Sequence, residues 1–169
     1  MGPRYLLPGV LLIGMLLLGG CGSAPGIPEH LKYPSPENAV DEVIRLINVE
    51  RAAHGLKPLK PHPQLMAAAE FHAEYMAKND CYEHVCRGGP TVQERIRQSG
   101  YRSGASENIH AAQRTPEGVV QGWMDSPGHR ENILTANDTE IGVGHYYLAP
   151  DGGRVPYYHY WVANFATGG

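Results

Sequence analysis

Apolar residues recur at helical spacing in the first periodic segment of the chain. Val40, Val43, Ile44 and Ile47 fall on one face of an α-helix at this spacing. A Ser-Pro-Glu sequence before them supplies a capping hydroxyl, a proline suited to the first turn and an acid near the positive end of the helix dipole. Gly55 follows the pattern as a C-terminal stop. The pattern therefore predicts one helix between the Ser-Pro-Glu sequence and Gly55.

Three further segments show helical periodicity. Pro63 begins a second predicted helix, and its inner face includes His72, which we interpret as a buried core residue. Residues 91–94, Thr-Val-Gln-Glu, form a capping box for a third, short helix. The fourth starts with Thr-Pro-Glu at 115–117 and runs to about Asp125, after which a Pro-Gly pair breaks it. The first two thirds of the domain are thus predicted to be mainly helical.

The C-terminal part of the chain changes to a strand pattern. Residues 141–148 and 155–165 are rich in β-branched and aromatic side chains, and a Pro-Asp-Gly-Gly turn separates them. A third strand is predicted at 106–112. With the hairpin centred on the Gly-Gly turn, His145 and His159 would meet as a packing pair or as part of a metal site. Helices followed by a hairpin favour an α+β fold.

The N-terminal segment has the features of an export signal. A basic start precedes an apolar run at 5–18, which is shorter than the roughly 20 residues that span a bilayer. The run ends in Leu-Gly-Gly before Cys21, which resembles the lipobox of bacterial lipoproteins. We predict a lipoprotein signal peptide at 1–20, lipidation of Cys21, a flexible tether at 21–35 and one domain at 36–169. An ordinary secretory signal, with Cys21 incidental, is the alternative.

The cysteine count agrees with export. The chain has three cysteines, and if Cys21 carries lipid, Cys81 and Cys86 remain as a pair. An oxidising compartment would allow this pair to form a disulfide, which would fix the short loop that carries His84. A zinc site of Cys81, His84 and Cys86 is the alternative, although its ligand spacing fits no common zinc module.

Charge narrows the classes of partner. The net charge is −3 and no long basic run is present, so there is no electrostatic basis for binding nucleic acid. No internal repeat is visible, and the length suits one compact domain. We therefore expect a monomer that contacts the membrane through its lipid anchor and binds no nucleic acid.

Three short blocks carry a family resemblance. They are Ser-Glu-Asn-Ile at 106–109, Trp-Met-Asp-Ser-Pro-Gly-His-Arg-Glu-Asn-Ile-Leu at 123–134 and Glu-Ile-Gly-Val-Gly at 140–144. In this order they resemble the bacterial, SCP-like extracellular branch of the CAP superfamily, the cysteine-rich secretory, antigen 5 and pathogenesis-related proteins. The resemblance covers residues 36–165. It implies an α-β-α sandwich, in which a small antiparallel sheet lies between helical layers.

The resemblance also implies a polar cleft. In the family this cleft holds two histidines and two acidic residues, and His84, Glu107 and His129 match three of the positions. Ser126 occupies the second acidic position, and Asp125 lies one residue out of register. Two neutral imidazoles and a carboxylate are suitable zinc ligands, so the three matched residues are the candidate metal site.

The resemblance fixes no single activity, and three functions stay open. The leading one is binding of a divalent metal or of a small or lipidic ligand in the cleft, without catalysis. The second is an envelope hydrolase that uses the histidines as acid and base, although no serine lies in a nucleophile-elbow motif. The third is a structural or adhesive display domain, in which the same side chains form a buried polar network.

Overall fold

The computed structural model describes residues 36–168, which contain five helices and four strands. The helices and strands predicted from the sequence all occur, and α5 and β1 are additional. In chain order the elements are α1 (Pro36–Ala53), β1 (Lys60–Pro61), α2 (Pro63–Lys78), α3 (Val92–Gln98), β2 (Ser106–Ala111), α4 (Pro116–Asp125), α5 (Pro127–Ile133), β3 (Glu140–Tyr147) and β4 (His159–Ala166).

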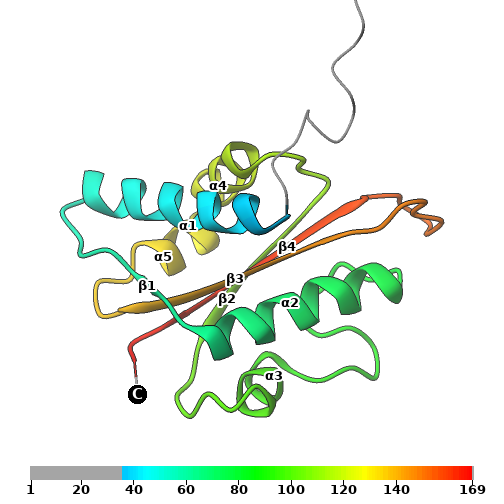
Figure 1. The fold of residues 1–169 in the computed structure, drawn as a ribbon, viewed down its shortest axis with the longest axis horizontal. Coiled ribbons are helices and arrows are strands. Elements are labelled where there is room, and N and C mark those ends of the chain that lie inside the picture. The colour runs from blue at the N-terminus through cyan, green and yellow to red at the C-terminus, as the bar shows by residue number, and fades with distance from the viewer. Residues whose placement is uncertain (1–35, 169) are drawn as a thin grey trace, which may run out of the picture.

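The strands form one sheet between two helical layers. Its order is β1-β3-β4-β2. Strand β4 is antiparallel to both β3 and β2, and the two-residue β1 is parallel to β3. Helices α1, α4 and α5 lie on one face of the sheet, and α2 and α3 lie on the other (Figure 1). The predicted α+β class and the α-β-α sandwich are confirmed. Strand β2, which carries Glu107, is an edge strand of this sheet.

Each face of the sheet has its own apolar core because side chains alternate along β4. Trp161 and Phe165 pack with Trp123 in the cluster beneath α1 and α4. Tyr160 and Val162 point to the opposite face and pack against α2. All five side chains are almost fully buried. Burial of both faces fixes the sheet between the layers and leaves its edges for polar residues.

Two glycines let α2 lie directly on the sheet. A Cβ added at Gly142 would fall 2.1 Å from the carbonyl carbon of Leu65, and one at Gly144 would fall 2.2 Å from the amide nitrogen of Glu70. Both neighbours are backbone atoms of α2, so no side-chain rotation can make room. The Gly-Val-Gly sequence of β3 therefore sets the distance between α2 and the sheet.

Helix α5 was not predicted from the sequence. The Pro-Gly pair after Asp125 was expected to end helical structure, but Pro127 instead begins a second helix. Ser126 is extended, with φ −96° and ψ 117°, and is both the C-cap residue of α4 and the N-cap residue of α5. Proline suits the first turn of a helix because its missing N–H has no partner there. The pair thus separates two helices and places His129 on the second.

The hairpin differs from its predicted bounds. Strand β4 begins at His159 rather than at residue 155, because a longer loop joins it to β3. Asp151 organises this loop: its carboxylate accepts hydrogen bonds from the Tyr158 amide at 2.9 Å and the Tyr160 hydroxyl at 2.8 Å. These bonds keep the pKa of Asp151 below its usual value against the opposing effect of burial.

The predicted signal peptide, the lipidation site Cys21 and the tether at 21–35 lie outside the described residues. Within residues 36–168, none of the helices has the length and apolar character that crossing a bilayer requires.

Candidate functional site

A short disulfide-closed loop between α2 and α3 carries the first candidate residue. Cys81 and Cys86 are joined by an S–S bond of 2.04 Å, so the predicted disulfide is confirmed. Both sulfurs are therefore unavailable as thiolates, and the alternative zinc site of Cys81, His84 and Cys86 is excluded. The backbone carbonyl of His84 accepts a hydrogen bond from Arg95 at 3.1 Å. Disulfide and hydrogen bond together fix the loop over the edge strand β2.

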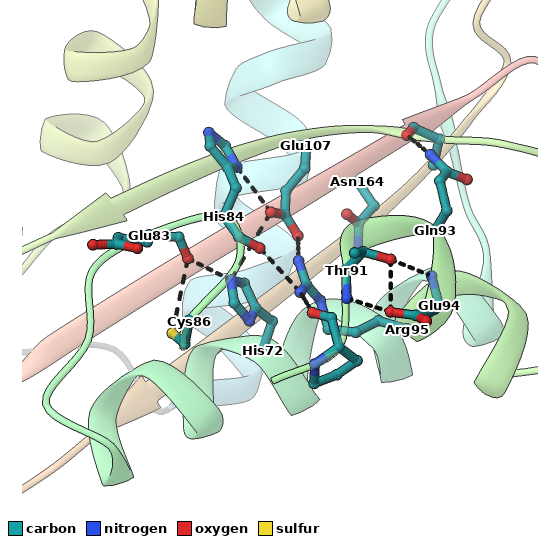
Figure 2. Close-up of polar contacts among 12 residues, drawn as sticks. His72, Glu83, His84, Cys86, Thr91, Gln93, Glu94, Arg95, Glu107 and Asn164 are labelled. Atoms are coloured by element: carbon teal, nitrogen blue, oxygen red, sulfur yellow. Dashed lines mark hydrogen bonds and ion pairs between the residues drawn. The ribbon is translucent and has the colours of Figure 1, made fainter. Parts of the chain in front are cut away.

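Glu107 is the centre of a buried polar cluster (Figure 2). Its side chain is 2% exposed, and each carboxylate oxygen has its own partner. Oε1 lies 2.9 Å from Nδ1 of His84, and Oε2 lies 2.6 Å from Nη2 of Arg95. The guanidinium of Arg95 is also buried, and it binds the backbone carbonyls of Pro90 and His84. A buried charge pair of this kind is tolerated because both partners are hydrogen-bonded.

The contact with Glu107 determines how His84 presents its ring. The Glu107 carboxylate accepts from Arg95 through Oε2 and presents Oε1 to His84 as an acceptor, so we assign the proton of the His84 ring to Nδ1. In the neutral imidazole the lone pair is then on Nε2. The His84 side chain is 48% exposed. The arrangement is a solvent-accessible imidazole that a buried carboxylate holds in one tautomer.

His72 lies beneath this pair, on α2. Its Nε2 lies 3.0 Å from the carbonyl oxygen of Glu83 and 3.9 Å from Oε1 of Glu107. Because the carbonyl can only accept, Nε2 carries the proton and the buried Nδ1 has no hydrogen-bond partner. Burial lowers the pKa of His72 to about 4, although the nearby carboxylate of Glu107 acts in the opposite direction. His72 is therefore neutral at physiological pH.

The depressed pKa of His72 predicts a loss of stability in acid. The unfolded chain takes up this proton near pH 6.5 and the folded chain near pH 4. The contribution of His72 to stability is fully present above pH 6.5, and between the two values the free energy of unfolding should fall by about 1.4 kcal/mol per pH unit. In His72→Gln, whose amide can donate to Glu83, denaturant titrations should show a shallower pH dependence. Parallel curves for both proteins would contradict the assignment.

A second polar network joins α5 to β2. The amide of Asn108 donates to the backbone carbonyl of His129 at 2.9 Å, and the amide of Asn132 donates to Oδ1 of Asn108 at 2.8 Å. Asn132 also lies 3.4 Å from the carbonyl oxygen of Glu107. Asn108 is fully buried, so these bonds satisfy its side chain and clamp α5 against the edge strand. A polar network of asparagine side chains thus surrounds the backbone of His129.

The imidazole of His129 is half-buried on α5. Burial lowers its pKa, and charge on His84 and His110 lowers it further. This ring and that of His84 are therefore close enough to interact electrostatically. Across residues 36–168 no group of three or more histidine, cysteine or carboxylate side chains is placed to hold a metal ion.

Asp125 and Ser126 occupy the junction between α4 and α5. The Asp125 carboxylate is exposed and accepts a hydrogen bond from Gln121 at 2.8 Å on the same helix. It lines a shallow pocket with Arg130 and Glu131. The amide of Ser126 donates to the carbonyl of Trp123 at 3.2 Å, which ends α4. The hydrogen bond from Gln121 to Asp125 lies within α4 and does not involve the cluster around Glu107.

Sequence reasoning missed two members of the Glu107 cluster. His72 was assigned to the inner face of its helix, but its proximity to Glu107 was not foreseen. Arg95 was not singled out, although Val92, Arg95 and Ile96 share the helical spacing of a buried face. The sequence signal for Arg95 was a basic residue at a helix position whose spacing predicts burial, because a buried charge needs a partner.

The predicted meeting of His145 and His159 occurs, with a shifted register. His145 pairs with Trp161 and Tyr147 pairs with His159, so the two imidazoles meet diagonally at 3.1 Å between Nε2 and Nδ1. The ring of His145 stacks on Trp161 with centroids 3.8 Å apart. Burial lowers the pKa of His145 to about 4. The two rings thus share a hydrogen bond across the strands, and His145 is held by its stack on Trp161.

The domain is a three-layer sandwich in which a buried carboxylate holds an imidazole at the edge of the sheet. Comparison with known proteins identifies the family to which this domain belongs. The family model described as CAP, cysteine-rich secretory protein family, matches residues 44–165. The chain therefore belongs to the CAP family. Its bacterial SCP-like character is confirmed by relatives and solved structures.

Among the relatives, YkwD of Bacillus subtilis is 39% identical over 115 residues, which cover 66% of this chain and 44% of YkwD. A solved extracellular protein containing an SCP domain, from Bacillus anthracis, is 26% identical with a TM-score of 0.68 over 85% of this chain and 44% of that protein. An outer surface protein of Borrelia burgdorferi shares the fold, with 19% identity and a TM-score of 0.69 over 80% of this chain and 97% of that one. This chain spans less than half the length of YkwD and of the B. anthracis protein.

Proposed function

We propose that this chain is an exported, lipid-anchored CAP-domain protein whose His84 and His129 bind a divalent metal ion, with zinc as the first candidate. The observation that carries the proposal is the hydrogen bond between Nδ1 of His84 and the buried carboxylate of Glu107. Metal-binding histidines commonly donate their second ring nitrogen to a carboxylate, which fixes the tautomer and makes the other nitrogen a better ligand.

The electrostatics of His129 supports the same proposal. Burial lowers the pKa of His129 and so favours its neutral form, which is the form that can coordinate a metal. His84 and His129 approach the edge strand from different elements, the disulfide loop and α5. An ion between them would bridge these two segments.

The contacts of Glu107 suggest that it orients His84 and is not itself a ligand. Both of its oxygens are already engaged, one by His84 and one by Arg95. The donor set that fits a metal is therefore two imidazoles, with water or an external ligand in the remaining positions. Such a site is expected to bind zinc more weakly than sites with three or four protein ligands. Bound zinc would supply a Lewis acid open to an added ligand.

Zinc titration by calorimetry tests the site. At pH 7.5, His84→Ala and His129→Ala should each lose at least tenfold in affinity, because each removes a ligand. Ser126→Glu should gain affinity, because it supplies the carboxylate that is absent at this position. Wild-type binding should weaken in acid, because a protonated imidazole cannot coordinate a metal. Equal affinity in all four proteins would contradict the metal proposal.

The same histidine favours one alternative. A carboxylate-held imidazole with a free Nε2 is also an arrangement for general acid–base catalysis, so an envelope hydrolase acting on peptide or glycan is the second candidate. Turnover of envelope fragments that His84→Ala abolishes would support it. A chain that binds neither zinc nor a small or lipidic ligand, and turns over no substrate, would instead be a structural or adhesive display domain.

Export and anchoring rest on the N-terminal sequence and on relatives. The lipobox-like Leu-Gly-Gly-Cys ends the apolar run, and the similar SCP-domain protein of B. anthracis is extracellular. Cys21→Ala should move the protein from the membrane to the soluble fraction, because a diacylated cysteine supplies the two chains that stable anchoring needs. Ser23→Ala, two residues away, serves as the control. Native protein without lipid by mass spectrometry would contradict anchoring.

A further inference from the structure

One edge of the central sheet is mostly uncovered within residues 36–168. Strand β1 pairs with only two residues of β3, Glu140 and Ile141. The amide of His62 then donates to the carbonyl of Ile141 at 2.8 Å. The backbone polar groups of Ile141 therefore point away from β4, toward the open edge of the sheet. Because backbone groups alternate in direction along a strand, Val143 and His145 point theirs to the same side. The sheet order gives β3 no strand partner there beyond β1.

A pocket of about 410 Å³ lies at this edge, between α1 and α2. Figure 1 shows the two helices on either side of β3, with β1 at one end of the strand. The pocket walls combine apolar and acidic side chains: Val40 and Asp41 from α1, and Met66 and Glu70 from α2. Open strand edges recruit further strands, and an extended segment adds backbone hydrogen bonds as well as side-chain contacts in the flanking groove.

We propose that residues 29–33 of this same chain, Glu-His-Leu-Lys-Tyr, dock in this groove as an added strand on β3. Prolines 28 and 34 bracket these five residues, which contain no proline and can donate every backbone N–H. Leu31 and Tyr33 share one face of an extended segment, and on the α2 side of the sheet they would meet Met66. Lys32 falls on the other face, toward α1, where it matches the negative charge of Asp41.

The position of the segment favours it over other occupants. Tyr33 is three residues before Pro36, where α1 begins, and three extended residues reach about 10 Å. Val40, which lines the groove, is about one helical turn further, or about 6 Å. A segment tethered this closely has an effective concentration in the millimolar range, which a separate peptide or a second copy rarely reaches.

Docking would also shorten the free chain between residue 21 and the domain. A free chain over residues 21–35 has a root-mean-square reach of about 20 Å, whereas residues 21–28 alone reach about 15 Å. The occupied groove would therefore hold the domain closer to whatever is attached at residue 21 and limit its rotation. This inference is independent of the zinc proposal, because the groove and the His84 cluster involve different residues.

Hydrogen–deuterium exchange of the full chain in detergent tests the proposal, read by mass spectrometry on the peptide 143–148. In Leu31→Pro, which removes an N–H from the middle of the segment, the amides of this peptide should exchange at least tenfold faster than in wild type. Ser23→Pro, outside the segment, should exchange as wild type does. Lys32→Glu should also accelerate exchange, and Asp41→Lys combined with Lys32→Glu should restore protection.

Two results would overturn the inference. One is equal exchange of the peptide 143–148 in Leu31→Pro and in wild type, which would mean that the segment does not cover this edge. The other is protection that rises with protein concentration, which would assign the groove to a second copy of the chain. Retained exchange rates in α1 and α2 would show that Leu31→Pro leaves the domain folded.

Discussion

Gly144→Ala should lower the free energy of unfolding by about 3 kcal/mol or more. The added methyl group would lie 2.2 Å from the amide nitrogen of Glu70 and 2.4 Å from the carbonyl carbon of Ala69. Real Cβ atoms do not approach backbone this closely, so α2 must move away from the sheet. That movement would open contacts along the buried face of α2, including those of Met76.

Gly152→Ala is the matched control for this experiment. A Cβ at Gly152 would meet no atom within 4 Å, so its free energy of unfolding should stay within about 0.5 kcal/mol of wild type. Urea denaturation of the two variants gives the comparison directly. Equal stabilities would show that α2 is not held against β3 by the absence of a side chain at Gly144.

The glycines of β3 illustrate what the sequence could predict and what it could not. Residues 141–148 were assigned to a strand from their β-branched and aromatic side chains, and this was confirmed. That prediction gave Gly142 and Gly144 no role of their own. Their role depends on which helix crosses the strand and how closely, and no local pattern carries that information. An isolated glycine in a strand indicates a close approach without naming the partner.

The helix at Pro127 was missed for a related reason. A Pro-Gly pair is a strong breaker in a local pattern, and α4 does end just before it. Whether the chain then turns away or starts a new helix depends on what the following residues pack against. Ile133 is fully buried in the core beneath α1 and α4, and this tertiary contact favours the second helix over a loop.

The candidate site was partly predictable. The resemblance to the CAP family predicted that His84 and Glu107 share one cleft, and the structure places Nδ1 of His84 2.9 Å from Oε1 of Glu107. Arg95 and His72 were not foreseen as partners of the carboxylate, because their pairing requires α2, α3 and β2 to be placed in three dimensions. The joint coordination of a metal by His84 and His129 stays a prediction.

Arg95→Met should be among the most destabilising single changes near the site. It leaves the Glu107 carboxylate buried without its cation, and breaking a buried ion pair by removing one partner costs about 3–5 kcal/mol. Glu107→Gln leaves the opposite charge of Arg95 unpaired and should also destabilise strongly. The double variant, Arg95→Met with Glu107→Gln, removes both charges and should recover much of the loss.

A double-mutant cycle by urea denaturation measures this coupling. Arg45→Met is the matched control, because Arg45 pairs with Glu42 at 2.7 Å on an exposed face of α1, and its loss should leave stability unchanged within error. Additive losses at Arg95 and Glu107 would contradict a coupled buried pair. Strong coupling would also explain why the carboxylate stays fixed beneath His84, since Arg95 holds one oxygen and leaves the other for Nδ1 of the imidazole.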